Sequence, residues 1–174
     1  MKKEIRKLMI DKRNKLSKEE VTIRSKRIIE KIMKHDAFIQ AETVALFNAF
    51  GNEIDLSGLL TLDKIFLYPK IDNNDMNFYI IKSNTEYVKS NYGIMEPKDG
   101  KILNDIDLII VPLLAYNQNK HRIGYGKGYY DRFIHKYNPK HKIGVSFDFQ
   151  YIDFIEDIND EPLDDIITDK EDNL

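Results

Sequence analysis

The segment with the greatest chemical content is the glycine-rich stretch RIGYGKGYYDR at residues 122–132. Its glycines alternate from Gly124 to Gly128, so the backbone can take positive φ angles, approach a ligand closely and turn its N–H groups toward an anion. Arg122 and Lys127 add two positive charges. The helix expected after the loop adds partial positive charge at its N-terminus. These features are typical of a phosphate-binding site.

The spacing of the stretch differs from the common phosphate-binding fingerprints. A dinucleotide-binding loop follows G-x-G-x-x-G, and a Walker A loop ends in Gly-Lys-Ser or Gly-Lys-Thr. Residues 122–132 match neither pattern. Taken alone, the stretch is therefore also compatible with a glycine-rich turn between a strand and a helix that binds no ligand.

Hydrophobic patterns predict the elements that position this loop. Residues 107–116 form the strongest buried-strand pattern, and Pro112 within it predicts an end or a bend of the strand. Other predicted strands cover residues 43–50, 65–69, 76–81, 142–147 and 165–168, and predicted helices cover residues 3–16, 17–35, 54–62 and 129–137. Ser17 and Glu20 form a capping-box pattern. Strands that alternate with helices favour a mostly parallel sheet flanked by helices in a Rossmann-like, three-layer α/β architecture.

Length and composition limit the classes of protein. The 174 residues suit one domain over residues 1–174, and 42% hydrophobic content suits a globular fold. The absence of cysteine excludes disulfides, Cys₄ zinc sites and a thiol nucleophile. The four histidines lack metal-binding spacing, so we expect them to be surface or packing residues.

Charge and hydropathy point away from nucleic acid and membrane as partners. The net charge is -2, with a basic N-terminal part and an acidic stretch after Asp148. An RNA-binding role for the basic part is disfavoured by this balance and by the lack of an RNP-type aromatic motif. Charges interrupt every N-terminal apolar run, and no run of 18 apolar residues occurs. We expect a cytoplasmic monomer that binds neither nucleic acid nor membrane.

The stretch DLIIVPLLAYNQNKHRIGYGKGYYDRF resembles the signature of 5-formyltetrahydrofolate cyclo-ligases, also called 5,10-methenyltetrahydrofolate synthetases. Further stretches resemble motifs of that family in the same order along the chain. They are KKEIR at 2–6, FNAFGNEI at 47–54, YGIMEP at 92–97, IGVSF at 143–147 and NDEPLD at 159–164. Asn159 stands where the family usually has histidine. The resemblance therefore covers nearly the whole chain.

The resemblance implies ATP- and Mg²⁺-dependent cyclisation of 5-formyltetrahydrofolate, free or polyglutamylated. It places the nucleotide at Lys2, Arg6, Arg122, Ile123, Gly124, Tyr125, Gly126, Lys127, Gly128, Tyr129 and Tyr130. It assigns catalytic roles to Arg122, Tyr125 and Lys127, and folate binding to Asn48, Glu53 and Tyr125. It assigns metal binding to Asp131 and Asp160, with Asp157 and Asp164 as alternatives to Asp160.

Each assignment has a simpler interpretation without the resemblance. Lys2 and Arg6 lie four residues apart and fit an exposed basic helix face, and Asp131 fits a carboxylate that stabilises a helix N-terminus. Glu53 fits an exposed loop residue, and the tyrosines fit packing between helix and sheet. Two alternative functions also stay open: a catalytically silent nucleotide- or folate-binding module, and another ATP-dependent folate or thiamine-pathway enzyme.

Overall fold

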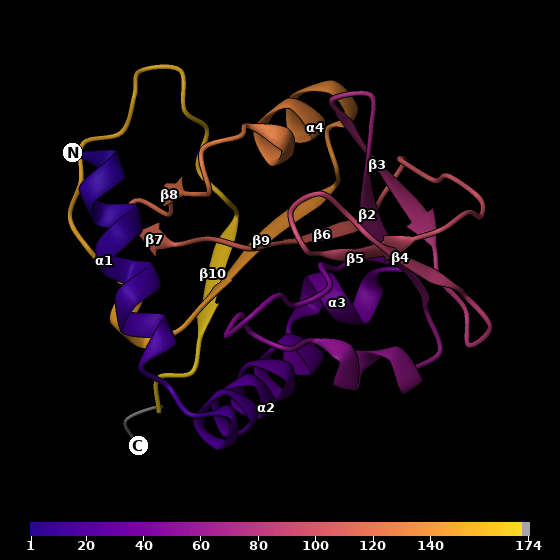
Figure 1. The fold of residues 1–174 in the computed structure, drawn as a ribbon, viewed down its shortest axis with the longest axis horizontal. Coiled ribbons are helices and arrows are strands. Elements are labelled where there is room, and N and C mark those ends of the chain that lie inside the picture. The colour runs from indigo at the N-terminus through magenta and orange to yellow at the C-terminus, as the bar shows by residue number, and fades with distance from the viewer. Residues whose placement is uncertain (172–174) are drawn as a thin grey trace.

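The computed structural model describes residues 1–171, and its centre is a six-stranded sheet (Figure 1). The strand order is β10-β9-β6-β1-β2-β3. The strands are β1 (Thr43–Ala45), β2 (Ile65–Asp72), β3 (Asp75–Ile80), β6 (Leu108–Val111), β9 (His141–Ser146) and β10 (Asp165–Thr168). All neighbouring pairs are parallel except β2 and β3, which form an antiparallel hairpin. The predicted single-domain α/β fold with a mainly parallel sheet is confirmed.

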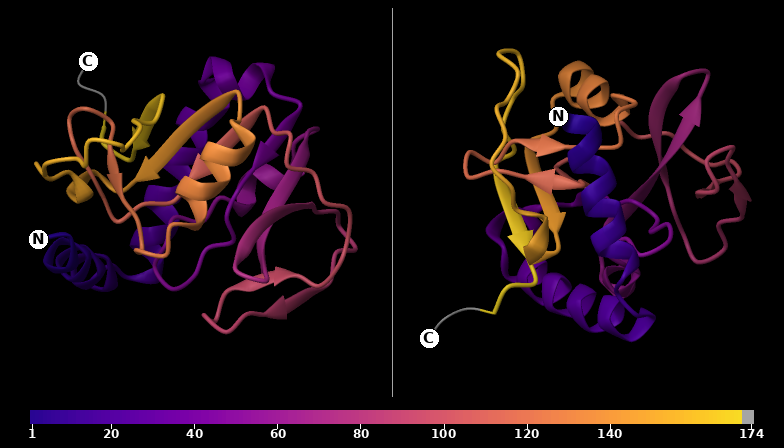
Figure 2. Two further views of the ribbon diagram at one scale, coloured as in Figure 1. Left: turned by 90° about the horizontal axis from the view of Figure 1, so that it is seen from above. Right: turned by 60° about the vertical axis from the view of Figure 1, so that its left-hand side comes forward.

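Helices cover both faces of the sheet, because side chains alternate between the faces along each strand. On β6, Leu108 and Ile110 pack in the core with α2 (Lys18–Lys34) and α3 (Asp36–Gln40). Ile109 and Val111 pack on the opposite face with α4 (Tyr129–Tyr137). Figures 1 and 2 show α2 and α4 on opposite sides of the strands. The result is the predicted three-layer arrangement.

Local signals in the sequence predicted the first two helices well. Helix α1 (Lys2–Asn14) ends two residues before its predicted end. Helix α2 begins after Ser17, whose hydroxyl accepts from the Glu20 N–H at 3.1 Å while Glu20 accepts from the Ser17 N–H at 3.2 Å. The predicted capping box is therefore formed, and it satisfies backbone donors at the start of α2.

The strand predicted over residues 107–116 stops at Pro112, as expected from the missing N–H of proline. The chain bends there and continues as β7 (Ala115–Tyr116), which pairs with β8 (Arg122–Ile123) in a small separate sheet. Gln150 holds the bend, because its buried amide donates to the carbonyls of Leu113 and Leu114 at 3.2 and 2.9 Å. The hairpin β7–β8 was not predicted, and it carries the chain to the glycine-rich stretch.

Several other predictions need correction. The strand predicted over residues 43–50 ends at Ala45, because the chain leaves the sheet after Leu46 pairs with Leu67. The helix predicted over residues 54–62 is the 3₁₀ segment η1 (Ser57–Thr61). A second 3₁₀ segment, η2 (Asp148–Gln150), follows β9. Helix α3 and an antiparallel arm of β4 (Tyr87–Lys89) and β5 (Met95–Pro97) were not predicted.

Within residues 1–171, no helix combines the length and the apolar character needed to cross a bilayer.

Candidate active site

A cleft of about 640 Å³ lies at the carboxyl ends of the central strands. Its walls come from α1, the segment after β1, the β4–β5 arm, the glycine-rich stretch and residues 157–161. In α/β folds, ligands bind at this edge of the sheet. The first-choice site residues predicted from the sequence all line the cleft: Lys2, Arg6, Asn48, Glu53, Arg122, Ile123, Gly124, Tyr125, Gly126, Lys127, Gly128, Tyr129, Tyr130, Asp131 and Asp160. Of the two alternatives for the metal, Asp157 lines the cleft and Asp164 does not. The structure thus brings the first-choice residues together, while their individual roles stay predictions.

The glycine-rich stretch between β8 and α4 forms one end of the cleft. Gly126 and Gly128 have φ angles of +94° and +73°, which L side chains rarely adopt. Gly126 also faces Arg6 closely, since a Cβ on Gly126 would lie 3.3 Å from the Arg6 guanidinium carbon. Arg6 in turn donates from Nε to the Gly124 carbonyl at 2.8 Å. Helix α1 therefore packs directly against the loop predicted to bind phosphate.

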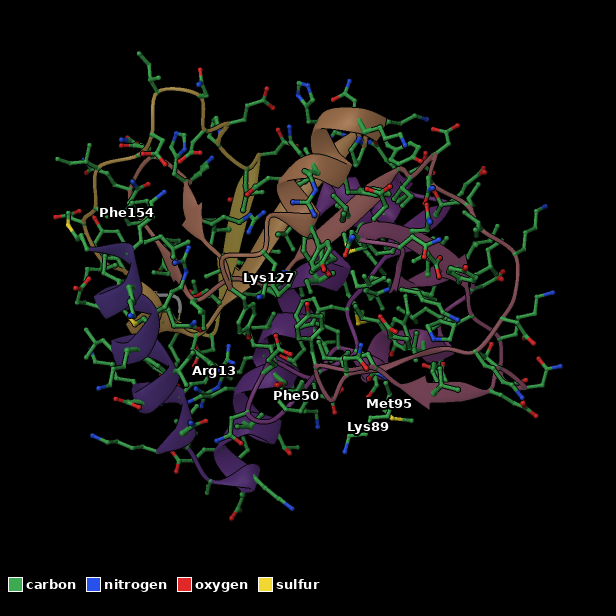
Figure 3. All side chains as sticks on the ribbon, turned by 45° about the horizontal axis from the view of Figure 1, so that its top comes forward. Arg13, Phe50, Lys89, Met95, Lys127 and Phe154 are labelled. Carbon is green, nitrogen blue, oxygen red and sulfur yellow. The ribbon has the colours of Figure 1, made fainter. Side chains whose placement is uncertain are left out.

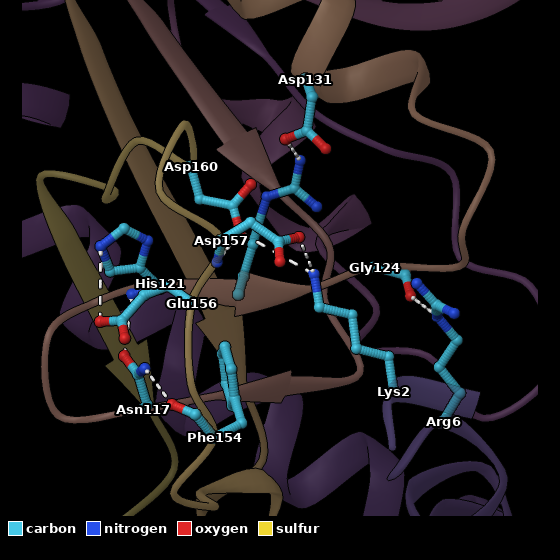
Figure 4. A network of polar contacts seen from close by, with 11 residues as sticks. Lys2, Arg6, Asn117, His121, Gly124, Asp131, Phe154, Glu156, Asp157 and Asp160 are labelled. Atoms are coloured by element: carbon cyan, nitrogen blue, oxygen red, sulfur yellow. Dashed lines mark hydrogen bonds and ion pairs between the residues drawn. The ribbon is translucent and has the colours of Figure 1, made fainter. Parts of the chain in front are cut away.

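Acidic side chains hold two of the cations at this end of the cleft (Figure 4). Lys2 pairs with Asp157 at 2.7 Å and lies 3.9 Å from Asp160. Arg122 donates to Asp131 at 2.7 Å, and its side chain is only 10% exposed. Burial lowers the pKa of Arg122, and the charge of Asp131 opposes that shift. The cleft end is thus a mixed cluster of cations and carboxylates.

The carboxylates of this cluster suit Mg²⁺ bound together with phosphate. Among residues 1–171, no three acidic or histidine side chains converge as a complete metal-binding group. Mg²⁺ commonly takes one or two protein carboxylates and completes its shell with phosphate and water oxygens. Asp131 has a side chain 77% exposed at the cleft, and Asp160 faces the same end. The donor set therefore fits a metal that arrives with a nucleotide.

Glu53 is a buried carboxylate that lines the cleft next to the glycine-rich stretch. It is 7% exposed and accepts from the Phe50 N–H at 2.8 Å and from the Tyr125 hydroxyl at 2.9 Å. Burial raises the pKa of Glu53, whereas the Phe50 N–H, the charge of Arg13 and the Tyr125 hydroxyl lower it. The exposed-loop interpretation of Glu53 is wrong. A buried carboxylate beside an open cleft is suited to binding N–H donors of a ligand.

The other predicted folate and aromatic positions differ in their contacts and exposure. Asn48 donates to the Met95 carbonyl at 3.4 Å, which ties the segment after β1 to the β4–β5 arm. Tyr125 is 45% exposed. Tyr130 lies against Phe78, with ring centroids 6.4 Å apart, and Tyr129 lies under the Arg132 guanidinium at 5.0 Å. Tyr129 and Tyr130 thus have packing contacts, and the ligand-binding roles assigned to the tyrosines stay predictions.

Some residues that line the cleft or contact its lining were not predicted. Arg13 is 8% exposed and donates from Nη2 to the Tyr125 hydroxyl at 2.8 Å. Phe50 and Tyr92 add aromatic surface, and Glu96 adds a second buried carboxylate. Figure 3 shows Arg13, Phe50 and Lys127 around the same region of the molecule. Arg13 follows Arg6 by seven residues, two helical turns, and this spacing is the signal that could have placed it on the cleft face of α1.

One of the four histidines also lines the cleft. His121 lines the cleft, and its side chain is 13% exposed and 3.7 Å from Glu156 (Figure 4). It belongs to the segment between β7 and β8, a hairpin that hydrophobic patterning did not predict. The nearby Asn117 amide donates to the Phe154 carbonyl at 3.2 Å, so this segment also anchors residues 154–156 beside the cleft.

Comparison with known proteins agrees with this architecture. The chain is 35% identical to the 5-formyltetrahydrofolate cyclo-ligase of Mycoplasma genitalium, over 95% of this chain and 96% of the relative. It is 31% identical to that of Mycoplasma pneumoniae, over 95% of this chain and 97% of the relative. The solved structure of Aquifex aeolicus 5,10-methenyltetrahydrofolate synthetase matches with a TM-score of 0.87 and 33% identity, covering 98% of this chain and 90% of that one. The Mycoplasma pneumoniae synthetase structure matches with a TM-score of 0.78 and 27% identity, covering 97% and 99%.

The sequence profile of the 5-formyltetrahydrofolate cyclo-ligase family matches residues 1–169. This match takes in every wall of the cleft, from Lys2 on α1 to the segment with Asp160. The chain therefore belongs to the 5-formyltetrahydrofolate cyclo-ligase family.

Proposed function

We propose that this enzyme converts 5-formyltetrahydrofolate and ATP to 5,10-methenyltetrahydrofolate, ADP and phosphate, with Mg²⁺ as cofactor. The observation that carries the proposal is a single cleft lined by both a cationic glycine loop and a buried carboxylate, Glu53. The names of the similar proteins from Mycoplasma and Aquifex support the same reaction class.

The chemical problem is that the formyl group of the substrate is an amide. Its carbon is a poor electrophile, and its oxygen is a poor leaving group. Transfer of the terminal phosphoryl group of ATP to the formyl oxygen solves both difficulties. N10 of the folate then attacks the activated carbon, the five-membered ring closes, and the oxygen leaves as phosphate, which takes up the proton lost from N10. The protein contributes alignment and charge stabilisation, and this sequence of steps needs no protein nucleophile.

At the phosphate end, the chain offers backbone N–H groups and several cations. Lys127 lies in the loop, Arg122 comes from β8, and Lys2 and Arg6 come from α1. We assign Lys127 and Arg122 to stabilising negative charge on the transferring phosphoryl group. Lys2 can exchange Asp157 for a phosphate at low cost, because ion pairs near the surface contribute little stability.

Asp131 and Asp160 are the residues that would hold Mg²⁺ in this proposal. When bound, the metal supplies neutralisation of phosphate charge. Asp131 also holds the Arg122 guanidinium at 2.7 Å. One carboxylate would thus orient the cation at the phosphate end as well as serve the metal.

At the folate end, Glu53 would accept hydrogen bonds from the N–H and amino groups of the pterin, and Asn48 would line the same wall. Tyr125 connects the glycine-rich loop to Glu53, because its backbone belongs to the loop and its hydroxyl donates to the Glu53 carboxylate. We therefore assign Tyr125 to aligning the formyl group with the nucleotide.

The direct test is the rise in ultraviolet absorbance of the methenyl product when purified protein receives 5-formyltetrahydrofolate, ATP and Mg²⁺. Omission of any one component should abolish the signal. Lys127→Ala should weaken use of ATP, whereas Glu53→Ala should mainly weaken binding of folate. Lys136→Ala is a matched control, since Lys136 is an exposed cation on α4 outside the cleft. A folded wild-type protein without turnover, or equal effects of the first two variants, would refute the assignment.

A further inference from the structure

One face of α1 holds two consecutive residues of the glycine-rich loop. Arg6 donates from Nε to the Gly124 carbonyl at 2.8 Å. Arg13, two helical turns later on the same face, donates from Nη2 to the Tyr125 hydroxyl at 2.8 Å. The Arg13 guanidinium carbon also lies 5.8 Å from the centre of the Tyr125 ring. Helix α1 therefore reaches the phosphate end of the cleft through Arg6 and the folate end through Arg13.

The contact made by Arg13 continues to Glu53. A guanidinium can only donate hydrogen bonds, so the Tyr125 hydroxyl accepts a hydrogen bond from Arg13 and donates one to the Glu53 carboxylate at 2.9 Å. The second oxygen of Glu53 accepts from the Phe50 N–H at 2.8 Å. Each carboxylate oxygen thus has one protein donor and keeps lone-pair capacity for a ligand in the cleft.

Stability does not explain why a charged residue occupies position 13. Arg13 is 8% exposed, and its Nε atom is buried with no hydrogen-bond partner in the described part of the chain. A buried charge with an unpaired donor is costly, and an apolar side chain of similar volume is often at least as stable. The guanidinium is therefore better explained by what it does to Tyr125 and Glu53.

We propose that Arg13 is a positioning residue of the folate site, which acts through Tyr125 to orient the Glu53 carboxylate toward the N–H donors of the pterin. The proposal rests on the function proposed above. It also makes α1 the element that serves both substrates, because Arg6 contacts the loop at the phosphate end. Arg13 itself does not line the cleft, so its effect on folate passes through the two residues that do.

The charge of Arg13 also affects how folate binding depends on pH. The groups that face Glu53 are Arg13 from α1, the Phe50 N–H from its own loop, and the Tyr125 and Tyr130 phenols from the loop and α4. Burial raises the pKa of Glu53, and Arg13 opposes this rise. Without Arg13 the pKa of Glu53 rises further, so the ionised form is lost at a higher pH. When the solution is acidified, a variant without Arg13 should therefore lose folate binding at a higher pH than the wild-type protein.

The main experiment compares Arg13→Met with Lys12→Met, a control that removes an exposed cation one residue away on α1. Isothermal titration without nucleotide measures the Kd of 5-formyltetrahydrofolate across pH, and the absorbance assay measures both KM values. Arg13→Met should raise the folate Kd about 10- to 100-fold, the range for loss of a hydrogen bond to a charged group. The acid midpoint of folate binding should move to higher pH, while Lys12→Met behaves as wild type. Unchanged folate Kd and unchanged midpoint in folded Arg13→Met would overturn the proposal.

A second variant keeps the test decisive if Arg13→Met does not fold. Tyr125→Phe removes only the hydroxyl that links Arg13 to Glu53, and it should raise the folate Kd in the same direction. In folded protein, the double variant Arg13→Met, Tyr125→Phe should raise the folate Kd by no more than the larger of the two single-variant effects. Fully additive effects would mean that Arg13 does not act through Tyr125 and would refute the proposal. Failure of the proposed function itself is distinguishable, since wild-type protein would then show no turnover at all.

Discussion

Gly126→Ala tests whether the backbone shape of the loop and its contact with α1 are needed for nucleotide use. Gly126 has a φ of +94°, and a Cβ there would lie 3.3 to 3.5 Å from three atoms of the Arg6 guanidinium. Alanine must therefore adopt an unfavourable backbone conformation and also push on Arg6. Because Arg6 donates to Gly124, the displacement would reach both sides of the predicted phosphate cradle.

The expected stability loss follows from the backbone conformation. A positive φ costs an L residue about 1–2 kcal/mol. For a chain of this size, each 1 kcal/mol corresponds to about 2–4 °C in Tm, so Gly126→Ala should lower Tm by about 2–8 °C. Gly100→Ala is the matched control. Gly100 has a φ of +135°, but its nearest neighbours would lie 3.7 Å or more from a Cβ, and it is not part of the cleft.

Thermal unfolding and the KM for ATP together separate backbone strain from loss of nucleotide binding. Both variants should melt at lower temperature in thermal unfolding followed by circular dichroism. Only Gly126→Ala should raise the KM for ATP, by about 10-fold if roughly 1.4 kcal/mol of phosphate binding is lost. The Kd of 5-formyltetrahydrofolate should stay near the wild-type value in both. The reasoning is refuted if Gly126→Ala lowers Tm without changing the KM for ATP, or if Gly100→Ala changes that KM equally.

Three further predictions concern the core, the pH range and the metal. Gln150→Leu should lower the free energy of unfolding, measured by urea denaturation, by several kcal/mol. Three buried backbone groups lose their hydrogen-bond partner, at about 1–3 kcal/mol each. The control Gln40→Leu, at an exposed position, should change the free energy of unfolding little. Burial raises the pKa of Tyr68 from 10.0 to about 12. Between pH 10.0 and about pH 12 the Tyr68 hydroxyl is deprotonated in the unfolded chain but still protonated in the folded chain. The free energy of unfolding therefore falls as pH rises. In Tyr68→Phe the urea midpoint should fall less steeply with pH. Asp131→Asn should raise the Mg²⁺ concentration needed for half-maximal turnover without changing the folate Kd; an unchanged Mg²⁺ requirement would remove Asp131 from the metal site.

Local chemistry explains which parts of the fold were predictable. The capping box at Ser17 and Glu20 forms within one helical turn, and Pro112 ends β6 because proline lacks an N–H. The turn between β2 and β3 also follows from local residues, since Asn73 and Asn74 take φ angles of +49° and +71°, which asparagine tolerates better than most residues. Such features need no information from distant parts of the chain.

Elements that depend on distant partners were less predictable. The β4–β5 arm is short and half-exposed, so its hydrophobic alternation is weak. The strand that begins at Thr43 was predicted too long, because an apolar run does not reveal where neighbouring strands stop pairing. The segment after Ala45 stays buried at Leu46 and Phe47, but it serves as a wall of the core and cleft instead of a strand.

The sequence by itself determined the α/β class, which depends on residue type and periodicity, both local properties of the chain. It also showed motifs that resemble the family, and the nucleotide- and folate-binding residues are predictions from that resemblance. Only the tertiary structure decided that Glu53 is buried and that Arg13 bonds to Tyr125, a residue 112 positions away. The physical reason is that burial, and with it the direction of a pKa shift, depends on which segments pack together, and residue type alone does not reveal that packing.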